Sequence, residues 1–203
     1  MIELCPEGMI GKGLHRECYI HPDDPNKCIK VVVLRGEEET RREQAYYKLL
    51  QKKDISWDML PKFYGVIPTS MGSGAVFDLI RDSNGEVGKT FEFYFESVEL
   101  TAQNAEGLLN ALLNLNTYLV DQNIMTMSLK PKNIIYQRQD DQRGVAVIID
   151  NIGNSDMIPI STHCRYFGRK KIQRKWDRFL SLLQRDYPQN SALQALIANH
   201  FYG

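Results

Sequence analysis

Neither sign of charge predominates in this sequence, since 25 Lys and Arg residues balance 25 Asp and Glu residues among 203. A neutral chain gives no reason to expect binding to nucleic acid or to an anionic membrane, unless a local basic patch provides it. Apolar runs of membrane-spanning length are also absent, and the first residues lack the basic and then apolar pattern of a secretory signal. We therefore expect a cytoplasmic protein that binds no nucleic acid and has no membrane span.

Cysteine is scarce, and its spacing excludes the common metal and redox motifs. The four cysteines form neither a C-x-x-C pair nor a zinc-like grouping with the four histidines. Reduced, mostly structural thiols are expected. With 43% apolar and 25% charged residues, the composition is that of an ordinary globular domain with a buried core.

The first 80 residues alternate short apolar runs with turn residues, which predicts a string of hairpin-connected strands. Residues 37–53 contain no Gly or Pro and place apolar residues at helical spacing, so we expect one amphipathic helix there. The strands are expected at 9–10, 17–20, 28–34, 62–66 and 75–80, with a turn at 21–26.

Residues 81–203 have a different, mainly helical pattern. A polar, glycine-bearing turn at 81–88 precedes an apolar stripe that predicts a long helix over 101–121, and we expect this second part to start helical. A β-branched run at 145–149 suits a buried strand, and helices are expected at 169–180 and 191–200. We predict an α+β domain of two lobes, 1–80 and 81–203.

Two glycines near the start are candidates for phosphate binding. Gly11 and Gly13 lie in a strand-turn-strand setting, where the lack of a Cβ lets backbone amides approach a phosphate. Taken alone, the pair favours a simple hairpin, and no G-K-[ST] ending supports a Walker-type loop.

Lys30 interrupts an otherwise apolar run, and a charge in the middle of a buried strand is costly unless a partner or a phosphate meets it. We expect it to bind phosphate and to pair with Glu43 of the following helix, with Glu39 as the alternative. The other interpretation is an exposed lysine on an edge strand.

The stretch Leu129-Lys130-Pro131-Lys132-Asn133, followed by Asp150 after a second apolar run, is typical of a phosphoryl-transfer site. In protein kinases, a loop H-R-D-L-x-x-x-N and a later D-F-G supply a base, a cation and two Mg²⁺ ligands. Asn133 and Asp150 are therefore candidate metal ligands, although each alone could be a turn cap. Lys130 is the candidate cation for the γ-phosphate.

The usual catalytic base is missing from this pattern. Ser128 stands where the kinase motif has Asp, and a serine hydroxyl cannot take up a proton near pH 7. Binding of nucleotide and transfer of phosphate must therefore be considered separately.

The segment 169–180 is a basic helix in which Lys171, Arg174, Lys175 and Arg178 are spaced to share one face. A solvated face is the default interpretation, and an anion or an acidic partner is the alternative. Trp176 and its apolar neighbours are expected to pack inward.

Together these motifs resemble the protein-kinase-like fold over most of the chain, and more closely the YrbL family of bacterial proteins, named for the PhoP regulatory network. The segments that resemble this family are 11–13, 16–22, 28–31, 41–43, 126–134 and 150–153. The sequence departs from protein kinases at Ser128, in the extra residue between Asp150 and Gly153, and in the absence of an A-P-E motif.

The resemblance implies an ATP and Mg²⁺ binding protein of two kinase-like lobes. The residues that would bind nucleotide are Gly11, Gly13, Lys30, Glu43 and Asn133. The candidate catalytic residues are Ser128, Lys130 and Asp150. Two hypotheses remain: an atypical kinase that acts on a protein or small-molecule phosphoacceptor, and a pseudokinase. The alternative is a regulatory interaction module that binds no nucleotide.

Overall fold

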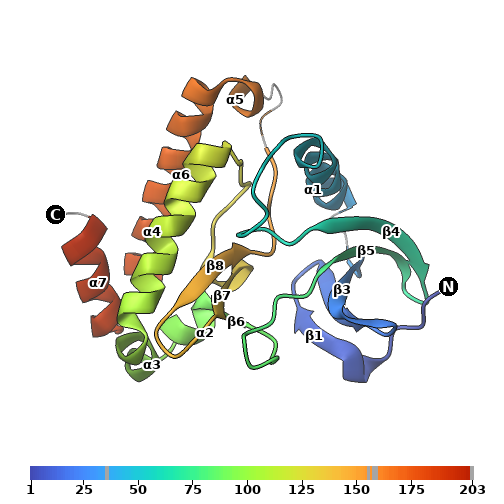
Figure 1. Ribbon diagram of the computed structural model, residues 1–203, viewed down its shortest axis with the longest axis horizontal. Coiled ribbons are helices and arrows are strands. Elements are labelled where there is room, and N and C mark those ends of the chain that lie inside the picture. Colours follow the sequence, from blue (N-terminus) through green and yellow to red (C-terminus); the bar gives the residue numbers. More distant parts are fainter. Residues whose placement is uncertain (35–36, 155, 157–159, 202–203) are drawn as a thin grey trace. The chain divides into compact units, whose positions relative to one another are not determined.

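The computed structural model describes residues 1–34, 37–154, 156 and 160–201. The chain divides after Ile80 into two units, Met1–Ile80 and Arg81–Gly203. Within the described residues the fold is α+β, with antiparallel sheets and seven α-helices (Figure 1). None of those helices has both the length and the apolar character needed to cross a bilayer.

The first unit consists of a five-stranded sheet and one α-helix. Its strands are hydrogen-bonded in the order β1-β2-β3-β5-β4. The elements in chain order are the 3-10 helix η1 (Pro6–Gly8), β1 (Met9–Lys12), β2 (Arg16–His21), β3 (Asp24–Val32), α1 (Glu37–Leu50), β4 (Phe63–Thr69) and β5 (Gly72–Asp78).

The two faces of this sheet are covered by different parts of the unit. Side chains alternate along β3, so Ile29 and Val31 pack in an apolar cluster with Leu4 of the N-terminal segment. Phe77 of β5 contacts Tyr47 of α1 edge to face, with 5.2 Å between ring centroids. The helix α1 therefore packs against the sheet through Tyr47. It ends three residues earlier than expected, at Leu50.

The second unit contains a three-stranded sheet, in the order β6-β7-β8, and six α-helices among its described residues. Its elements are β6 (Lys89–Thr90), α2 (Phe91–Phe95), α3 (Val98–Gln103), α4 (Ala105–Gln122), the 3-10 helix η2 (Pro131–Asn133), β7 (Ile134–Arg138), β8 (Gly144–Ile148), α5 (Ile160–His163), α6 (Arg165–Asp186) and α7 (Ser191–Phe201).

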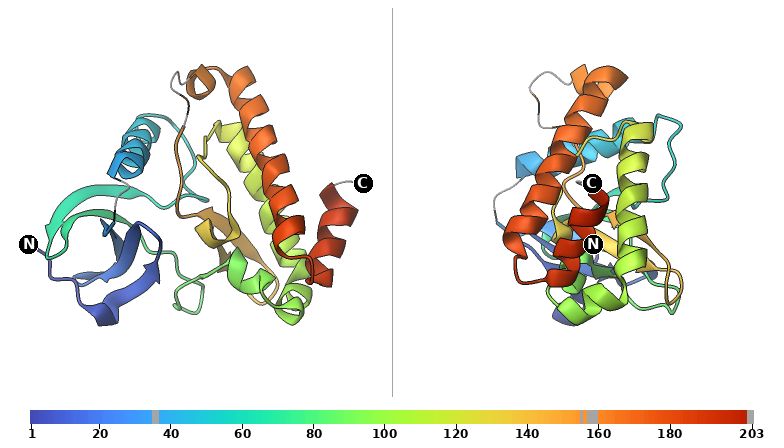
Figure 2. Two further views of the ribbon diagram at one scale, coloured as in Figure 1. Left: turned by 180° about the vertical axis from the view of Figure 1, so that it is seen from behind. Right: turned by 90° about the vertical axis from the view of Figure 1, so that its left-hand side faces the viewer.

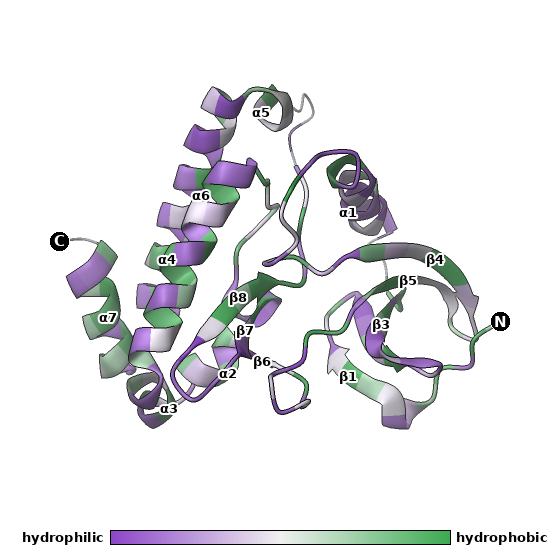
Figure 3. Ribbon diagram, in the orientation of Figure 1, coloured by the Kyte–Doolittle hydropathy of each residue, from purple (hydrophilic) through white to green (hydrophobic). Residues whose placement is uncertain are grey.

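The long helices α4 and α6 of this unit run alongside each other, and α7 packs against both (Figures 1 and 2). The helix α4 also packs against β8. Gly107 of α4 allows a close approach to the sheet, because a Cβ there would lie 2.1 Å from the Tyr136 hydroxyl oxygen. Burial raises the pKa of that tyrosine to about 12. Figure 3 shows β8 as mainly hydrophobic and α6 as largely hydrophilic.

Three expectations about local structure are wrong. The helix expected over 101–121 is broken at Asn104, whose side-chain amide donates to the Leu100 carbonyl at 2.8 Å. The second unit begins with the short strand β6 rather than with a helix, and Thr90 then caps the unexpected α2. The turn at 21–26 is shorter than expected, since His21 already pairs with Asp24.

Asn190 joins α7 to the segment of α2 and α3. Its amide donates to the Phe95 carbonyl and to the Thr101 hydroxyl, each at 2.8 Å, while its carbonyl oxygen accepts from the Leu193 amide at 3.0 Å. The residue is 4% exposed, so these bonds have no water to replace them.

We expect Asn190→Ala to lower the free energy of unfolding by about 2 kcal/mol, from the lost helix cap and the unpaired buried groups. Asn190→Asp keeps the cap but loses the donor, so it should separate the two contributions. Urea denaturation measures both variants; an unchanged midpoint in Asn190→Ala would contradict the expectation.

Candidate functional site

The candidate metal ligands of the second unit lie at one end of the β7–β8 hairpin. Ile134 pairs with Ile148 in the antiparallel register, so the start of β7 and the end of β8 share an edge. One residue further out, the Asn133 carbonyl accepts from the Ile149 amide at 2.9 Å. The strand pairing therefore sets Asn133 opposite Ile149, one residue before Asp150.

The Asn133 side chain is held in a buried position. The residue is 7% exposed and ends η2, where its backbone amide donates to the Lys130 carbonyl at 2.9 Å. Its side-chain Nδ2 is buried and has no hydrogen-bond partner among the described residues. A buried amide donor without a partner is costly, and at a functional site it indicates a group that a ligand satisfies.

Asp150 lies two residues after the end of β8, in a bend. Its Oδ1 accepts from the Asn151 amide at 2.7 Å. Asn151 has a φ of 62° and Gly153 a φ of 145°, both values that L side chains other than Asn rarely adopt. Two of the three residues that follow the carboxylate therefore have a positive φ.

This turn pairs with the segment that precedes Ser128. The Met127 amide donates to the Asn151 carbonyl at 2.8 Å, and the Gly153 amide donates to the Met125 carbonyl at 3.0 Å. Ser128, which is half-buried, follows directly on this short ladder. The segments that contain Ser128 and Asp150 are thus connected by backbone hydrogen bonds.

The donor set at this end of the hairpin suits a hard cation that keeps other ligands. In the part of the chain that the structure describes, no three His, Cys, Asp or Glu side chains are grouped to hold a metal ion. Asn133 and Asp150 offer an amide and a carboxylate oxygen, and Mg²⁺ characteristically takes few protein oxygens and completes its octahedron with phosphate and water. The residues present therefore fit Mg²⁺ that arrives with a phosphorylated ligand.

Lys130 is exposed and lines a cavity of about 240 Å³ between η2, α2 and the end of α6. The residues around this cavity are Glu92, Lys130, Pro131, Lys132, Leu182, Leu183, Arg185, Asp186 and Tyr187. Burial, with the nearby carboxylates of Glu92 and Glu96, raises the pKa of Tyr187 to about 12. The cavity thus has cationic and anionic groups in its wall.

In the first unit, Lys30 lies on the sheet face that α1 covers. Its Nζ is 4.7 Å from the centroid of the Phe77 ring, and the same ring packs on Tyr47 of α1. Across the sheet, Lys30 is paired with Cys18 and Ala75, so β3 is an interior strand. The interpretation of Lys30 as an edge-strand lysine is therefore wrong.

Glu43 is one of the most buried charged residues of the first unit, at 1% exposed. Its carboxylate forms an ion pair with the Arg16 guanidinium of β2. The sequence pattern did not indicate Arg16 as the partner of Glu43. The expected pairing of Glu43 with Lys30 stays a prediction, and Glu39 is exposed.

Gly11 and Gly13 lie at the end of β1 and the start of the turn to β2. Neither has a positive φ, and a Cβ at Gly11 would meet Cys18 at an ordinary 3.8 Å. At Gly13 a Cβ would lie 3.3 Å from the Arg16 carbonyl oxygen, which accepts from the Gly13 amide at 2.8 Å. The turn therefore favours glycine at 13 more than at 11, and phosphate binding by the pair stays a prediction.

The basic residues of α6 do not form one solvated face, contrary to the default expectation. Arg174 and Arg178 are exposed, whereas Lys171 is buried and Lys175 is half-buried on the side that faces residues 125–127. As expected, Trp176 is buried on this helix. The i, i+4 spacing of the two lysines, in phase with the apolar residues, was the signal that sequence reasoning missed.

Comparison with known proteins identifies the family. Residues 2–184 match the model of the family described as PhoP regulatory network protein YrbL. A protein of Escherichia coli strain K12, described as uncharacterized protein YrbL, is 37% identical over 206 residues, covering 97% of this chain and 98% of its own length. A Shigella flexneri protein of the same description matches equally. The chain therefore belongs to the YrbL family of PhoP regulatory network proteins.

Proposed function

We propose that this protein binds ATP together with Mg²⁺ in a kinase-like manner, as an atypical kinase or a pseudokinase. In this proposal Asn133 and Asp150 bind the metal and Lys130 neutralises the γ-phosphate. Lys30, paired with Glu43, and the amides near Gly11 and Gly13 bind the remaining phosphates. The two units then correspond to the two lobes of a kinase-like fold.

One observation carries the proposal: the backbone pairing sets Asn133 opposite Ile149, one residue before Asp150, and the buried Asn133 Nδ2 has no hydrogen-bond partner among the described residues. A phosphate oxygen or a metal-bound water would satisfy that donor. Bound Mg²⁺ would supply charge neutralisation for the phosphates. The arrangement of Lys30 on the face that α1 covers, with Glu43 buried on that helix, supports the same interpretation.

Ser128 favours slow transfer or none. Its hydroxyl cannot accept a proton near pH 7, and a positioned base typically contributes about 10²- to 10⁴-fold to the rate. Phosphoryl transfer depends mainly on positioning and charge stabilisation, so the metal and Lys130 could support residual transfer. Ser128→Ala is therefore expected to change nucleotide affinity little.

A thermal-shift titration with ATP, with and without Mg²⁺, tests the proposal. A ligand that binds only the native state stabilises it by RT ln(1 + [L]/Kd), about 2.7 kcal/mol at 100 times Kd. We expect the melting temperature to rise with the logarithm of ATP concentration, and to rise more with Mg²⁺. Mg²⁺ without ATP, and ATP with a chelator, are the controls.

No shift at millimolar ATP would overturn the nucleotide proposal and favour the interaction module instead. Where the shift is present, release of ADP from the intact protein distinguishes the atypical kinase from the pseudokinase. Lys30→Ala should reduce the shift in either case, because it removes a phosphate-binding cation.

A further inference from the structure

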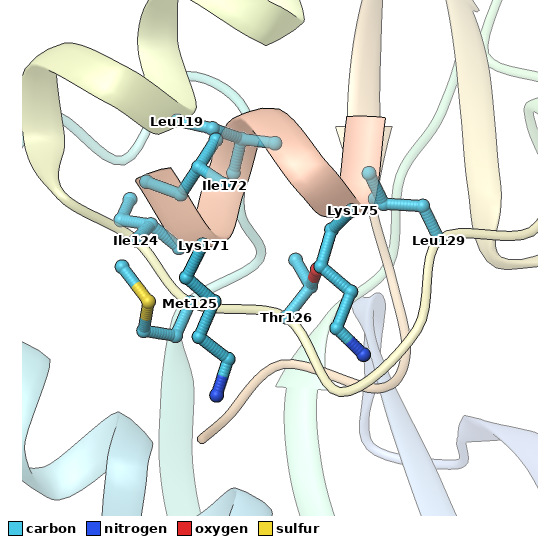
Figure 4. A pocket seen from close by; sticks show the side chains of 8 residues that line it. All are labelled: Leu119, Ile124, Met125, Thr126, Leu129, Lys171, Ile172 and Lys175. Atoms are coloured by element: carbon cyan, nitrogen blue, oxygen red, sulfur yellow. The ribbon is translucent and has the colours of Figure 1, made fainter. Parts of the chain in front are cut away.

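Two lysines of α6 lie one helical turn apart and point toward the loops described above. Figure 4 shows Lys171 and Lys175 side by side, with both amino groups extending in the same direction, past Met125 and Thr126. Both lie on the inner side of the helix, away from the exposed Arg174 and Arg178.

Each lysine contacts one of the two paired segments. Lys175 Nζ donates to the Met127 carbonyl at 2.6 Å. This carbonyl belongs to the peptide group that joins Met127 to Ser128. Lys171 Nζ forms an ion pair with Asp156 at 2.7 Å and donates to the side-chain oxygen of Asn154, in the segment that follows Asp150.

These contacts have an energetic cost that ordinary packing residues would avoid. Lys171 is 7% exposed, and its hydrogen bond lowers the pKa of the Asp156 carboxyl. Burial lowers the pKa of the Lys175 ammonium, and the positive charges of Lys171, Arg178 and Arg174 act in the same direction. Apolar side chains of similar volume would fill these positions without desolvating a charge.

The crevice beside the two lysines is too small for a ligand. The crevice that they line with Leu119, Ile124 and Leu129 does not admit even a water molecule. The contacts that the structure gives to the two amino groups are with the Met127 carbonyl, Asn154 and Asp156.

We propose that Lys175, assisted by Lys171, is a positioning residue for the metal and phosphate site. Lys175 fixes the orientation of the peptide before Ser128, and the ladder from Met127 to Asn151 transmits that position to the turn after Asp150. Lys171 fixes the segment that follows this turn, through its hydrogen bond to Asn154. This inference rests on the proposed binding of Mg²⁺ and ATP.

The test compares Lys175→Met with Arg178→Met. Methionine keeps the apolar stem of lysine and removes the donor, while the Arg178 variant removes one cation from an exposed position of the same helix. For each variant, the affinity for ATP is measured by calorimetry with Mg²⁺ and with a chelator, at a temperature where the protein is fully folded.

Mg²⁺ is expected to increase the affinity for ATP. We expect Lys175→Met to make this increase about tenfold smaller, and Arg178→Met to change it by no more than about twofold. Lys175→Arg, which restores a donor to the Met127 carbonyl, should recover part of the gain. A purely structural lysine would instead lower the melting temperature of the variant and leave the Mg²⁺-dependent gain of the folded protein unchanged.

The outcomes separate the inference from the proposed function. A full Mg²⁺-dependent gain in Lys175→Met overturns the positioning role and leaves nucleotide binding intact. A wild-type protein whose ATP affinity does not depend on Mg²⁺ overturns the metal site, and the positioning role with it.

Discussion

Replacing Asp150 with Asn is expected to abolish the Mg²⁺-dependent part of the stabilisation by ATP while leaving the fold intact. The amide is nearly isosteric with the carboxylate, and its oxygen can still accept the hydrogen bond from the Asn151 amide. It has no negative charge, however, and Mg²⁺ sites in proteins are built on one or two carboxylates. In the kinase form of the proposal, the same change should also abolish release of ADP.

The magnitude follows from mass action. If wild-type protein gains about 2.7 kcal/mol at 100 times Kd, the variant should lose the whole difference between titrations with and without Mg²⁺. Asp177→Asn is the matched control, because Asp177 is exposed on α6. The amide oxygen of the new asparagine can still accept the hydrogen bond from the Gln173 side chain. An Asp150→Asn protein that retains the full Mg²⁺ effect would exclude Asp150 as a metal ligand.

Replacing Gly168 with Ala is expected to lower the free energy of unfolding by about 3 kcal/mol, the upper part of the range for overpacked cores. At an exposed helix position, the same change would instead raise the free energy of unfolding by about 1 kcal/mol. The sign of the measured change therefore distinguishes a close contact from an open position. A Cβ at Gly168 would lie 1.9 Å from Oδ1 of Asn123 and 2.8 Å from the Ser161 carbonyl oxygen.

Asn123 cannot easily move away from this added atom. It is 7% exposed, and its amide donates to the carbonyls of Ser161 and Thr162 at 3.2 and 3.3 Å. Asn123→Gly removes the side chain and tolerates the φ of 51° at this position. A double-mutant cycle measured by urea denaturation should therefore show that Gly168→Ala costs less in the Asn123→Gly background. Gln173→Ala, exposed on the same helix, is expected to change stability by less than about 0.5 kcal/mol.

Local pattern was sufficient where an element depends on its own residues. The β-branched run at 145–149 predicted β8, and the charged start followed by apolar residues at helical spacing predicted α1. The helix ends were less predictable, because Asn104 interrupts an apolar stripe that continues on both sides of it. A side chain that bonds to its own helix backbone can end a helix without changing the hydrophobic pattern.

The candidate site was likewise predictable only in part from the sequence. The spacing of Lys130, Asn133 and Asp150 was visible in the sequence, and so was the lack of an acidic residue at Ser128. The interaction partners of the charged residues were not visible in the sequence. Glu43 forms an ion pair with Arg16 of β2, and Lys175 donates to the carbonyl of a residue 48 positions earlier.

The sequence by itself determined the types of most elements, the order of the two units and the residues that we propose for phosphate binding, since these follow from periodicity and from side-chain chemistry. Only the tertiary structure decided which buried charges meet, that Lys171 and Lys175 face inward, and that Asn133 pairs with Ile149, the residue before Asp150. The physical reason is that burial and pairing depend on strand register and helix packing, which bring together residues far apart in the chain.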